Sequence, residues 1–517
     1  MTTESTSSYD DVPYQSNPFA QSQPERLAVA AKLFGLQPVL PSKAKVLELG
    51  CASGGNLIPL AARYPRTRFY GIDFSARQVS VAEKQIAALA LDNIRIESAD
   101  ITTFAPRETF DYIICHGVYS WVPEATRAAI LRICREALTE QGVAYISYNT
   151  YPGWRLRQVV REAMLFHAGD HADTTQRLTQ GRAFLQFMQQ ASDPASIFGQ
   201  MLKIESDMIA NFRDDYVLHE HLEQHNHPCY FKDFMAQADA HRLGYLGEAN
   251  FVEMLPQHFT PDVQRTLEQA SGGNIILTEQ YMDFLRNRYF RQTLLVHAER
   301  LGHVRRNIRA ELLTTFQLSV NVKTQRDVDV SSLTIATFES AHGRSMDVTE
   351  PIIKAALIIL GQRFPKTIDF EALFAAARAH SNTNELQRIT LLNALQALAL
   401  NGILDIQVEP LDFAGTSRPQ PQAFASAREQ VRSGVSATNQ RHEQVTLNPF
   451  QVALLALLDG KLGITDIEKS LVEECVAGKI GLQREGMAIR DRESIAGIMP
   501  GLVREKLRLL ELAALLI

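Results

Sequence analysis

The sequence has no long apolar run, no cysteine framework and no secretion signal. Its longer apolar stretches, residues 352–361 and 509–517, fall well short of the roughly eighteen residues that a membrane-spanning helix needs. The five cysteines are scattered and odd in number, which favours a reducing compartment over disulfides. The N-terminus is polar and acidic, unlike a signal peptide. We therefore expect a soluble, cytoplasmic protein without membrane insertion.

A strong net charge is also missing. The chain has 52 Lys and Arg residues against 58 Asp and Glu residues, a net charge of −6. Domains that bind nucleic acid are usually basic, so we expect no nucleic-acid partner. At 517 residues the chain is too long for a single core, and we expect several domains.

What the sequence does contain is a glycine-rich turn between a predicted strand and a predicted helix. The apolar run 45–49 leads into the turn, and residues 57–63 have a helical pattern. A nucleotide-binding fingerprint needs this strand–turn–helix context. A second apolar run, 68–72, brings Asp73 to the position about twenty residues further on, where a carboxylate can accept both ribose hydroxyls.

The turn nevertheless departs from the dinucleotide pattern G-x-G-x-x-G. Gly50 and Gly54 are present, but Ala52 stands where the backbone must approach a pyrophosphate. Glu48 adds a carboxylate beside the ligand, which attracts a cationic group rather than a diphosphate. S-adenosylmethionine carries an ammonium and a sulfonium and no phosphate. The motif predicts this cofactor; the alternative is a plain glycine turn after a buried strand.

Three further runs each predict a strand, one within residues 92–100, one at the start of 110–123 and one within 142–154. Strands that alternate with helical segments indicate an α/β fold with a parallel sheet covered by helices. Ligands of such sheets bind beyond the carboxyl ends of the strands. The residues that follow or flank these ends, together with one residue of the N-terminal arm, are our candidates for cofactor binding: Tyr14, Glu48, Gly50, Ala52, Gly54, Asn56, Asp73, Phe74, Asp100, Ile101 and His116.

Aromatic residues gather in the loops expected after the fourth and fifth strands. Ring faces attract an alkylammonium with about 0.5–2 kcal/mol, so these loops could line a channel for an amine acceptor. The alternative is that the rings cap the sheet and bind adenine. Asn149 could orient the amine, and His116 could be a general base or a packing residue. The candidates for the catalytic region are Tyr119, Trp121, Tyr148, Asn149 and Trp154, with Tyr151 beside them.

A histidine cluster raises the question of a metal site. It contains His219, His221, His225, His227 and Cys229. Its string HEHLEQH is not the H-E-x-x-H motif of zinc enzymes. We expect no metal here and a solvated polar helix end.

Beyond residue 160 the pattern is mainly helical. Residues 283–300 predict one helix with a polar, arginine-rich face that is solvated or forms ion pairs between domains, and with a buried stripe of Phe284, Leu285, Phe290, Leu294 and Leu295. Helices at 352–364, 369–377 and 386–400, followed by a turn and strand at 401–410, have a winged-helix-like order. We expect an interaction module there rather than a DNA-binding one.

Several strings resemble one family, the class I S-adenosylmethionine-dependent methyltransferases with a methyltransferase regulatory domain. These strings are YDDVPY, NPF, ELGCASGGN, HGVYSWVP, SYNTYPGW, HPCYFKDF, YLGEANF and YMDFLRNRYFRQTLLVH. The group includes rickettsial lysine methyltransferases that modify outer-membrane protein antigens. The resemblance covers residues 9–312 well and the rest more loosely. It implies a Rossmann-like sheet with an antiparallel edge strand and mostly helical domains after it. It also implies cofactor binding by Glu48, Gly50, Asp73, Asp100 and His116, and, for the characterised relatives, a lysine target.

We accordingly divide the chain into six parts. They are an N-terminal arm or lid (1–24), a methyltransferase domain (25–160), a helical regulatory or substrate domain (161–312), a winged-helix-like domain (313–410), a linker (411–448) and a C-terminal helical domain (449–517). The predicted function is in-line methyl transfer from S-adenosylmethionine to lysine side chains of a protein, an outer-membrane or surface protein being one candidate. Alternatives are a small-molecule N- or O-methyltransferase and a cofactor-binding regulatory protein without turnover.

Overall fold

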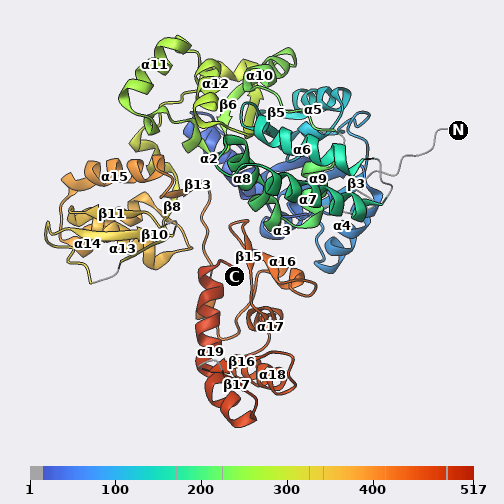
Figure 1. Ribbon diagram of the computed structural model, residues 1–517. Coiled ribbons are helices and arrows are strands. Elements are labelled where there is room, and N and C mark those ends of the chain that lie inside the picture. Colours follow the sequence, from blue (N-terminus) through green and yellow to red (C-terminus); the bar gives the residue numbers. More distant parts are fainter. Residues whose placement is uncertain are drawn as a thin grey trace.

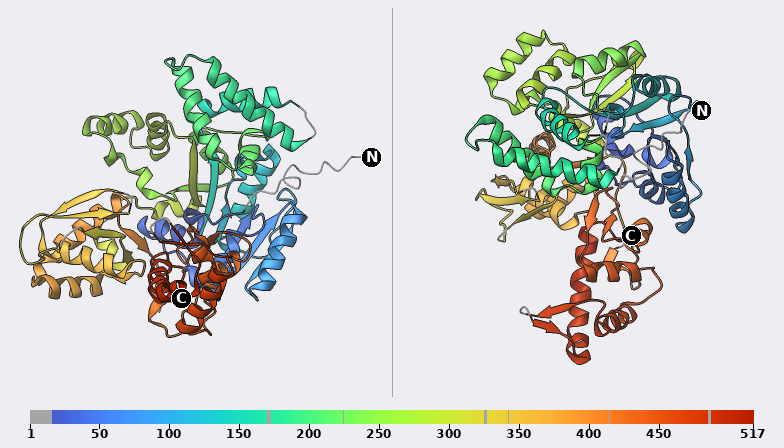
Figure 2. Two further views of the ribbon diagram at one scale, coloured as in Figure 1. Left: turned by 60° about the horizontal axis from the view of Figure 1, so that its bottom comes forward. Right: turned by 45° about the vertical axis from the view of Figure 1, so that its right-hand side comes forward.

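The computed structural model describes residues 16–169, 173–223, 225–324, 327–341, 343–413, 415–484 and 487–517. We name three parts of it: the sheet lobe (16–312), the middle lobe (313–413) and the C-terminal lobe (415–517). Figures 1 and 2 show the C-terminal lobe, drawn in red, projecting from the base of the molecule. None of the described helices is long and apolar enough to cross a bilayer.

The sheet lobe is built on seven strands in the order β3-β2-β1-β4-β5-β7-β6. Strands β1 to β5 pair in parallel, whereas β7 is antiparallel to both of its neighbours. This confirms the predicted Rossmann-like fold with an antiparallel strand at one edge, where β7 lies next to the terminal strand β6. The strands are β1 (Lys45–Leu49), β2 (Arg68–Asp73), β3 (Ile94–Ser98), β4 (Phe110–Cys115), β5 (Leu138–Asn149), β6 (Leu243–Glu248) and β7 (Phe290–His297).

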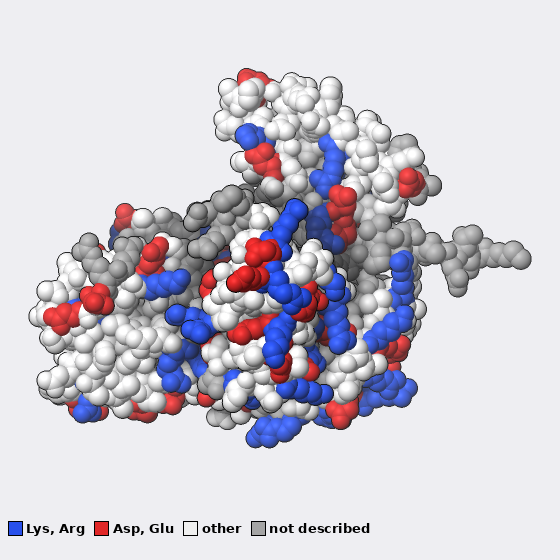
Figure 3. All heavy atoms as spheres, turned by 90° about the horizontal axis from the view of Figure 1, so that it is seen from below, with Lys and Arg blue, Asp and Glu red and all other residues white. Residues whose placement is uncertain are grey.

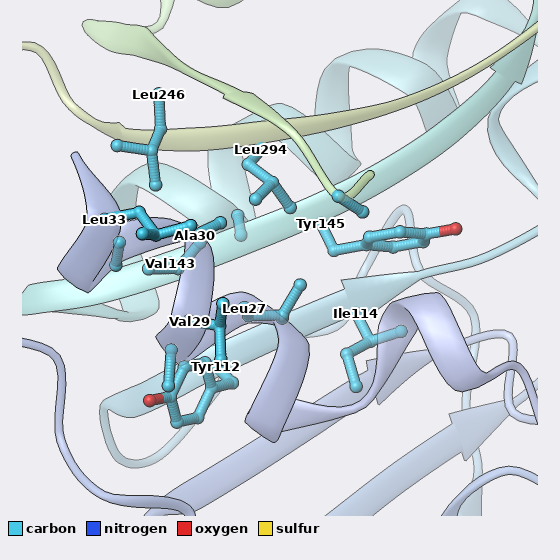
Figure 4. Packing of buried hydrophobic residues seen from close by; sticks show 14 of the residues in the cluster. Leu27, Val29, Ala30, Leu33, Tyr112, Ile114, Val143, Tyr145, Leu246 and Leu294 are labelled. Carbon is cyan, nitrogen blue, oxygen red and sulfur yellow. The ribbon is translucent and has the colours of Figure 1, made fainter. Parts of the chain in front are cut away.

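Helix α2 (Pro24–Leu33) lies across one face of this sheet (Figure 4). It is buried on nearly all sides, as expected for a helix whose residues are mostly apolar. The helix also contacts the middle lobe, and it therefore joins the two lobes. Figure 4 labels Leu27, Val29, Ala30 and Leu33 of α2 beside Tyr112, Ile114, Val143, Tyr145, Leu246 and Leu294 of the strands. The other helices that follow the first strands are α3 (Leu57–Arg63), α4 (Ala76–Ala88) and α5 (Glu124–Ala137).

Strands β6 and β7 come from the region after residue 160, where we expected helices. The predicted helix over 283–300 is wrong: helix α12 stops at Arg286, Asn287 adopts a left-handed conformation (φ 48°), and β7 begins at Phe290. Phe284 and Leu285 are about half exposed and form no buried stripe. A short apolar run fits a buried strand as well as a helix, and periodicity alone does not separate the two.

The remaining helices of the sheet lobe form two groups. Four of them follow β5 and enclose a small core of their own, which includes Val160, Met164 and Leu202. The other three accompany β6 and β7. In chain order they are α6 (Trp154–Ala168), α7 (Thr174–Ala191), α8 (Ile197–Asn211), α9 (Asp214–His221), α10 (Phe231–Ala240), α11 (Pro261–Ser271) and α12 (Ile275–Arg286).

The middle lobe confirms the three predicted helices and the strand after them. Two small sheets accompany these helices, in the orders β11-β10-β9 and β12-β8-β13. Its elements are β8 (Gln317–Ser319), β9 (Val322–Thr324), β10 (Ala336–Ser340), β11 (Ser345–Val348), α13 (Pro351–Arg363), β12 (Ile368–Asp369), α14 (Phe370–Ser381), α15 (Arg388–Leu400) and β13 (Asp405–Gln407).

The C-terminal lobe begins inside the segment that we expected to be a linker. Residues of 411–448 such as Phe424 and Ala427 are buried in one core with Leu454, Leu471 and Leu507. Positive and negative side chains are interspersed on the face seen from below (Figure 3). The elements are α16 (Ala425–Gln430), β14 (Ser436–Thr438), β15 (Gln444–Thr446), α17 (Pro449–Leu457), α18 (Ile464–Val476), β16 (Leu482–Arg484), β17 (Met487–Ile489) and α19 (Arg492–Leu512).

A buried ion cluster fixes β7 to its neighbours. Arg291 of β7 is 0% exposed, and its guanidinium bonds Glu248 at 2.6 Å, Asp283 at 2.8 Å and Glu279 at 3.0 Å. Arg288 is also buried, 3.1 Å from Asp283. At these two positions the expected solvated arginine face is instead an internal network.

Arg291→Met tests this cluster. The substitution removes the cation that all three buried carboxylates share and leaves only Arg288 beside Asp283 and Glu248. Breaking a buried ion pair in this way typically costs about 3–5 kcal/mol. Arg68→Met is the control, because Arg68 forms an exposed pair with Glu108 at 2.9 Å, and exposed pairs contribute about 0–1 kcal/mol. We expect a clearly lower melting temperature for Arg291→Met than for Arg68→Met by circular dichroism. Equal melting temperatures would contradict the role of the cluster.

Candidate cofactor site

The candidate site lies at the switch point of the sheet, beyond the carboxyl ends of β1 and β4. The chain continues from β1 toward β2 on one side and from β4 toward β5 on the other, and ligands of α/β sheets bind in the crevice between such strands. Gly50 follows β1 with φ 74°, and a Cβ atom there would lie 2.5 Å from Val118 after β4. Glycine is therefore needed where the two loops meet.

The backbone of the turn is held by β2. The amides of Gly50 and Cys51 donate to the carbonyl of Ile72 at 2.9 and 3.0 Å. Ala52 is left-handed (φ 47°), and its amide donates to Asp73 Oδ2 at 2.7 Å. The residue in place of the middle glycine thus has a glycine-like conformation, stabilised by the carboxylate at the end of β2.

Asp73 and Phe74 lie next to this turn. Asp73 Oδ1 accepts from the amide of Ser75 at 2.9 Å, so backbone amides orient both oxygens of the carboxylate. A carboxylate held in this way is the kind of group that accepts from ribose hydroxyls. The ring of Phe74 is 67% exposed beside it. The pair offers acceptors for a ribose and an aromatic surface for a base.

Glu48, at the end of β1, is buried with one oxygen unsatisfied. Oε1 accepts from Asn56 Nδ2 at 2.9 Å, whereas Oε2 has no hydrogen-bond partner among the described residues. Burial raises the pKa of Glu48 to about 8; the bond from Asn56 acts against this shift, and the charge of Asp73 adds to it. A buried carboxylate oxygen without a partner is costly, and a cationic donor would relieve this cost. The residues therefore fit the ammonium group of S-adenosylmethionine.

Asn56 connects the turn to the N-terminal arm. Its Nδ2 also donates to Ser22 Oγ at 3.1 Å, and its Oδ1 accepts from the amide of Phe19 at 3.0 Å. The amide of Gly55 donates to Ser16 Oγ at 2.7 Å, and a Cβ atom at Gly55 would lie 2.4 Å from the Ser16 carbonyl oxygen. The described part of the arm thus folds back onto the turn. Tyr14 lies outside the described residues.

His116, after β4, packs under the arm. Its ring centroid is 3.7 Å from that of Phe19, and its Nδ1 is 2.8 Å from the hydroxyl of Tyr145. Burial lowers the pKa of His116 to about 3. The imidazole is neutral at pH 7 and is a weak base.

Asp100 and Ile101 follow β3, at the same edge of the sheet but further from the turn. Asp100 is exposed, and its Oδ1 accepts from the amide and the hydroxyl of Thr102 at 2.8 and 2.7 Å. Ile101 is at the border of the core. The turn that Thr102 closes presents Asp100 toward solvent.

The aromatic candidates divide into buried and accessible rings. Tyr119, Tyr148 and Trp154 are each 1% exposed, so in this structure they are core residues and line no open channel. Tyr148 stacks on Phe234 of α10 at 4.1 Å. Trp121 and the further aromatic, Tyr151, keep partial exposure.

Asn149 ends β5 and is also buried. Its Nδ2 donates to Asn226 Oδ1 at 3.1 Å. Nearby, His219 and His221 are buried rather than solvated, and burial together with nearby arginines lowers the pKa of His221 to about 3. Among the described residues no group of three or more His, Cys, Asp or Glu side chains is arranged to hold a metal ion.

Sequence reasoning did not assign Ser16, Ser22 and His442 to the site. His442 of the C-terminal lobe has its Nε2 2.7 Å from Asn56 Oδ1. No local motif marks these residues, because their role depends on contacts between distant segments. The strings YDDVPY and NPF, the second of which includes Phe19, were the signals that the arm contributes.

Comparisons with known proteins identify the family. Three domain families match: "Methyltransferase domain" at residues 46–142, "Predicted methyltransferase regulatory domain" at 213–297 and "PKMT, C-terminal winged helix domain" at 419–515. An uncharacterized protein of Rickettsia prowazekii, RP789, is 34% identical over 498 residues, which cover 94% of this chain and 89% of that protein. This chain belongs to the same methyltransferase family. S-adenosylmethionine is the cofactor of this methyltransferase.

A solved structure of a related protein matches the fold of nearly the whole chain. PKMT2 from Rickettsia typhi in complex with AdoHcy superimposes with a TM-score of 0.89 at 29% identity, covering 98% of this chain and 100% of that one. Trans-aconitate 2-methyltransferase of Methylobacterium nodulans is 31% identical over 99 residues, 19% of this chain and 36% of that enzyme. The matched winged-helix domain, 419–515, lies in the C-terminal lobe, after the 313–410 module for which we predicted winged-helix order.

The state of Glu48 predicts how cofactor binding by this methyltransferase depends on pH. A carboxyl group with a pKa of about 8 must lose its proton to bind an ammonium, so binding weakens as pH falls. Between pH 7.5 and 6, where an α-amino group is mostly protonated, we expect affinity for S-adenosylmethionine to fall by about tenfold per pH unit, measured by calorimetry.

Glu48→Gln is the matched variant for this measurement. It should bind more weakly at pH 7.5 and show no such dependence on pH. Two other titratable groups near the turn stay in one state over this range, because burial lowers the pKa of His442 to about 3 and holds that of Cys51 well above its usual value. The same pH dependence in Glu48→Gln would exclude Glu48 as its source.

Proposed function

We propose that this methyltransferase transfers methyl groups from S-adenosylmethionine to lysine side chains of a protein. The observation that carries the proposal is the similarity to PKMT2, which extends over all three lobes. The match to trans-aconitate 2-methyltransferase covers only about a fifth of the chain and speaks for a shared methyltransferase domain, not for a shared acceptor. The motifs that resemble rickettsial protein-lysine methyltransferases support the same acceptor.

In this proposal the switch-point residues hold the cofactor. Glu48 binds the ammonium group through the oxygen that lacks a partner among the described residues, and Asp73 accepts the ribose hydroxyls. Phe74 offers its exposed ring to the adenine, with Asp100 and Ile101 beside it at the same edge. The arm residues Ser16 to Ser22 cover the turn and help to exclude water. Their position and chemistry support these roles.

The reaction mainly requires that the methyl donor and the acceptor nitrogen be held in the right relative position. The bound cofactor supplies a sulfonium methyl group, which passes in line to the acceptor nitrogen and leaves a thioether. A lysine must first lose its proton, at a cost of about 4–5 kcal/mol at pH 7. His116 is a poor base for this step because of its low pKa, so in this proposal solvent takes the proton. The protein then contributes by holding the two reactants collinear in a dry site.

The acceptor is proposed to approach past Trp121 and Tyr151. Both rings are partly exposed, and Trp121 packs edge-on against the buried Trp154 at 6.2 Å. Arg155 already covers one face of Tyr151 at 3.9 Å, which shows that this ring accepts a cation. The bond from Asn149 to Asn226 fixes the end of β5 beside them.

Transfer of labelled methyl groups tests the function. The purified protein is incubated with methyl-labelled S-adenosylmethionine and a cell-envelope extract, and labelled proteins are hydrolysed for amino-acid analysis. We expect label on protein bands, recovered as N-methylated lysine. Asp73→Ala should abolish most of the label because it weakens cofactor binding.

Two other outcomes would contradict the proposal. Label confined to the small-molecule fraction would indicate a small-molecule methyltransferase. Cofactor binding by calorimetry with no label in either fraction would indicate a binding protein without turnover.

A further inference from the structure

The hairpin between β14 and β15 brings four polar residues into the interior. Asn439, Gln440, Arg441 and His442 are consecutive, and all four are buried. Hairpin tips normally lie in solvent. This tip instead enters the junction of the three lobes and forms hydrogen bonds there.

The hairpin tip is fixed from several directions. Asn439 Oδ1 accepts from the amides of Arg441 and Glu443, both at 2.9 Å, which closes the turn. The carbonyl of Arg441 accepts from Gln23 of the arm at 3.0 Å, and its guanidinium bonds Asp405 of the middle lobe at 2.6 Å. Arg441 therefore anchors the tip to both other lobes.

His442 is the residue of this tip that reaches the cofactor site. It is buried and left-handed (φ 63°), and its Nε2 is 2.7 Å from Asn56 Oδ1. The Asn56 oxygen faces this histidine because the Asn56 nitrogen must donate to the carboxylate of Glu48. Nε2 consequently carries the proton and donates it. Burial lowers the pKa of His442 to about 3, so the ring stays neutral.

The backbone N–H of Phe19 fixes which way the Asn56 amide faces, because it is a donor in every state. When Glu48 is ionised, as it must be to bind an ammonium, the reverse orientation would set the Asn56 nitrogen against this N–H and the Asn56 oxygen against the carboxylate. It would also require His442 to move its proton from Nε2 to Nδ1. The bond from His442 therefore adds to that from Phe19 in holding the orientation in which Asn56 donates to Glu48.

We propose that His442 is a positioning residue of the cofactor site: through Asn56 it holds Glu48 so that Oε2 is presented to the amino group of S-adenosylmethionine. The C-terminal lobe is then part of the cofactor site, although His442 stands 386 positions after Asn56. The proposal rests on the assignment of Glu48 to the cofactor made above. By thermodynamic reciprocity, cofactor binding should in turn stabilise the docked hairpin.

The test compares full-length variants by calorimetry with S-adenosylmethionine. One hydrogen bond of this kind corresponds to about a three- to tenfold effect, so His442→Ala should bind about three- to tenfold more weakly at pH 7. His442→Gln retains an N–H donor and should recover most of the affinity. Arg432→Ala is the control, because Arg432 lies in the same lobe but forms only an exposed pair with Glu429 at 2.9 Å. Its affinity should equal that of the wild type.

The dependence of binding on pH separates positioning from general loosening. The hydrogen bond from Asn56 lowers the pKa of Glu48. In His442→Ala the Asn56 side chain is held less firmly and this bond weakens, so the pH midpoint of cofactor binding should move to a higher pH. His442→Gln should restore the midpoint. A second measurement uses the wild-type protein alone, so it does not depend on whether a variant folds. We expect the backbone amides of residues 439–445 to exchange hydrogen more slowly when the cofactor is bound than when it is absent.

The outcomes distinguish this inference from the site assignment. If Glu48→Gln is impaired while His442→Ala binds with wild-type affinity and wild-type pH midpoint, the role of His442 is overturned and the site stands. If the exchange of residues 439–445 is unchanged by the cofactor, the role of His442 is likewise overturned. If Glu48→Gln itself binds normally, the assignment of Glu48 fails, and this inference fails with it.

Discussion

The carboxylate of Glu48 depends on the side chain of Asn56, and Asn56 in turn depends on two segments that are far apart in the sequence, the N-terminal arm and the hairpin tip. Burying a carboxylate is expensive unless its oxygens are hydrogen-bonded. Asn56 satisfies one oxygen and leaves the other for a cationic ligand. This single arrangement fits a cofactor that carries an ammonium, and it joins the arm and the polar hairpin tip to the turn.

The same junction explains why the lobes act as one molecule. Asp405 of the middle lobe pairs with Arg26 of α2 and with Arg441 of the C-terminal lobe, and these two cations hold the pKa of its carboxyl well below the usual range. Glu25, also on α2, accepts from the backbone amides of Val408 and Glu409. The helix that packs on the sheet thus also binds the middle lobe through buried polar groups. In the proposal made above, the C-terminal lobe supports the methyl-donor site through His442, and the middle lobe holds the hairpin that carries this histidine.

Much of the methyltransferase domain could be predicted from the sequence because its signals are local. The strand, the glycine turn and the helix after it lie within twenty residues, and Asp73 follows at a fixed distance. The boundary between α12 and β7 was predicted wrongly, because the apolar run after Asn287 fits a helix as well as a strand. The segment 411–448 looked like a linker because it is polar. Its polar side chains are nevertheless buried, and partners elsewhere in the chain satisfy them.

The accessibility of the aromatic candidates could not be predicted either. Tyr119 follows the end of β4, as expected, whereas Tyr148 lies within β5, and Phe234 from a later helix packs against both. Contacts of that kind depend on the tertiary arrangement and leave no periodic trace. For the same reason the sequence pointed to Glu48 and Asn56 but gave no sign of His442.

A crystal structure of the protein with S-adenosylhomocysteine would test the central claim most directly. The account predicts that the amino group of the ligand lies within hydrogen-bonding distance of Glu48 Oε2, while Asn56 keeps its bonds to Glu48 and His442. An amino group bound elsewhere, with Glu48 Oε2 still lacking a partner, would contradict it.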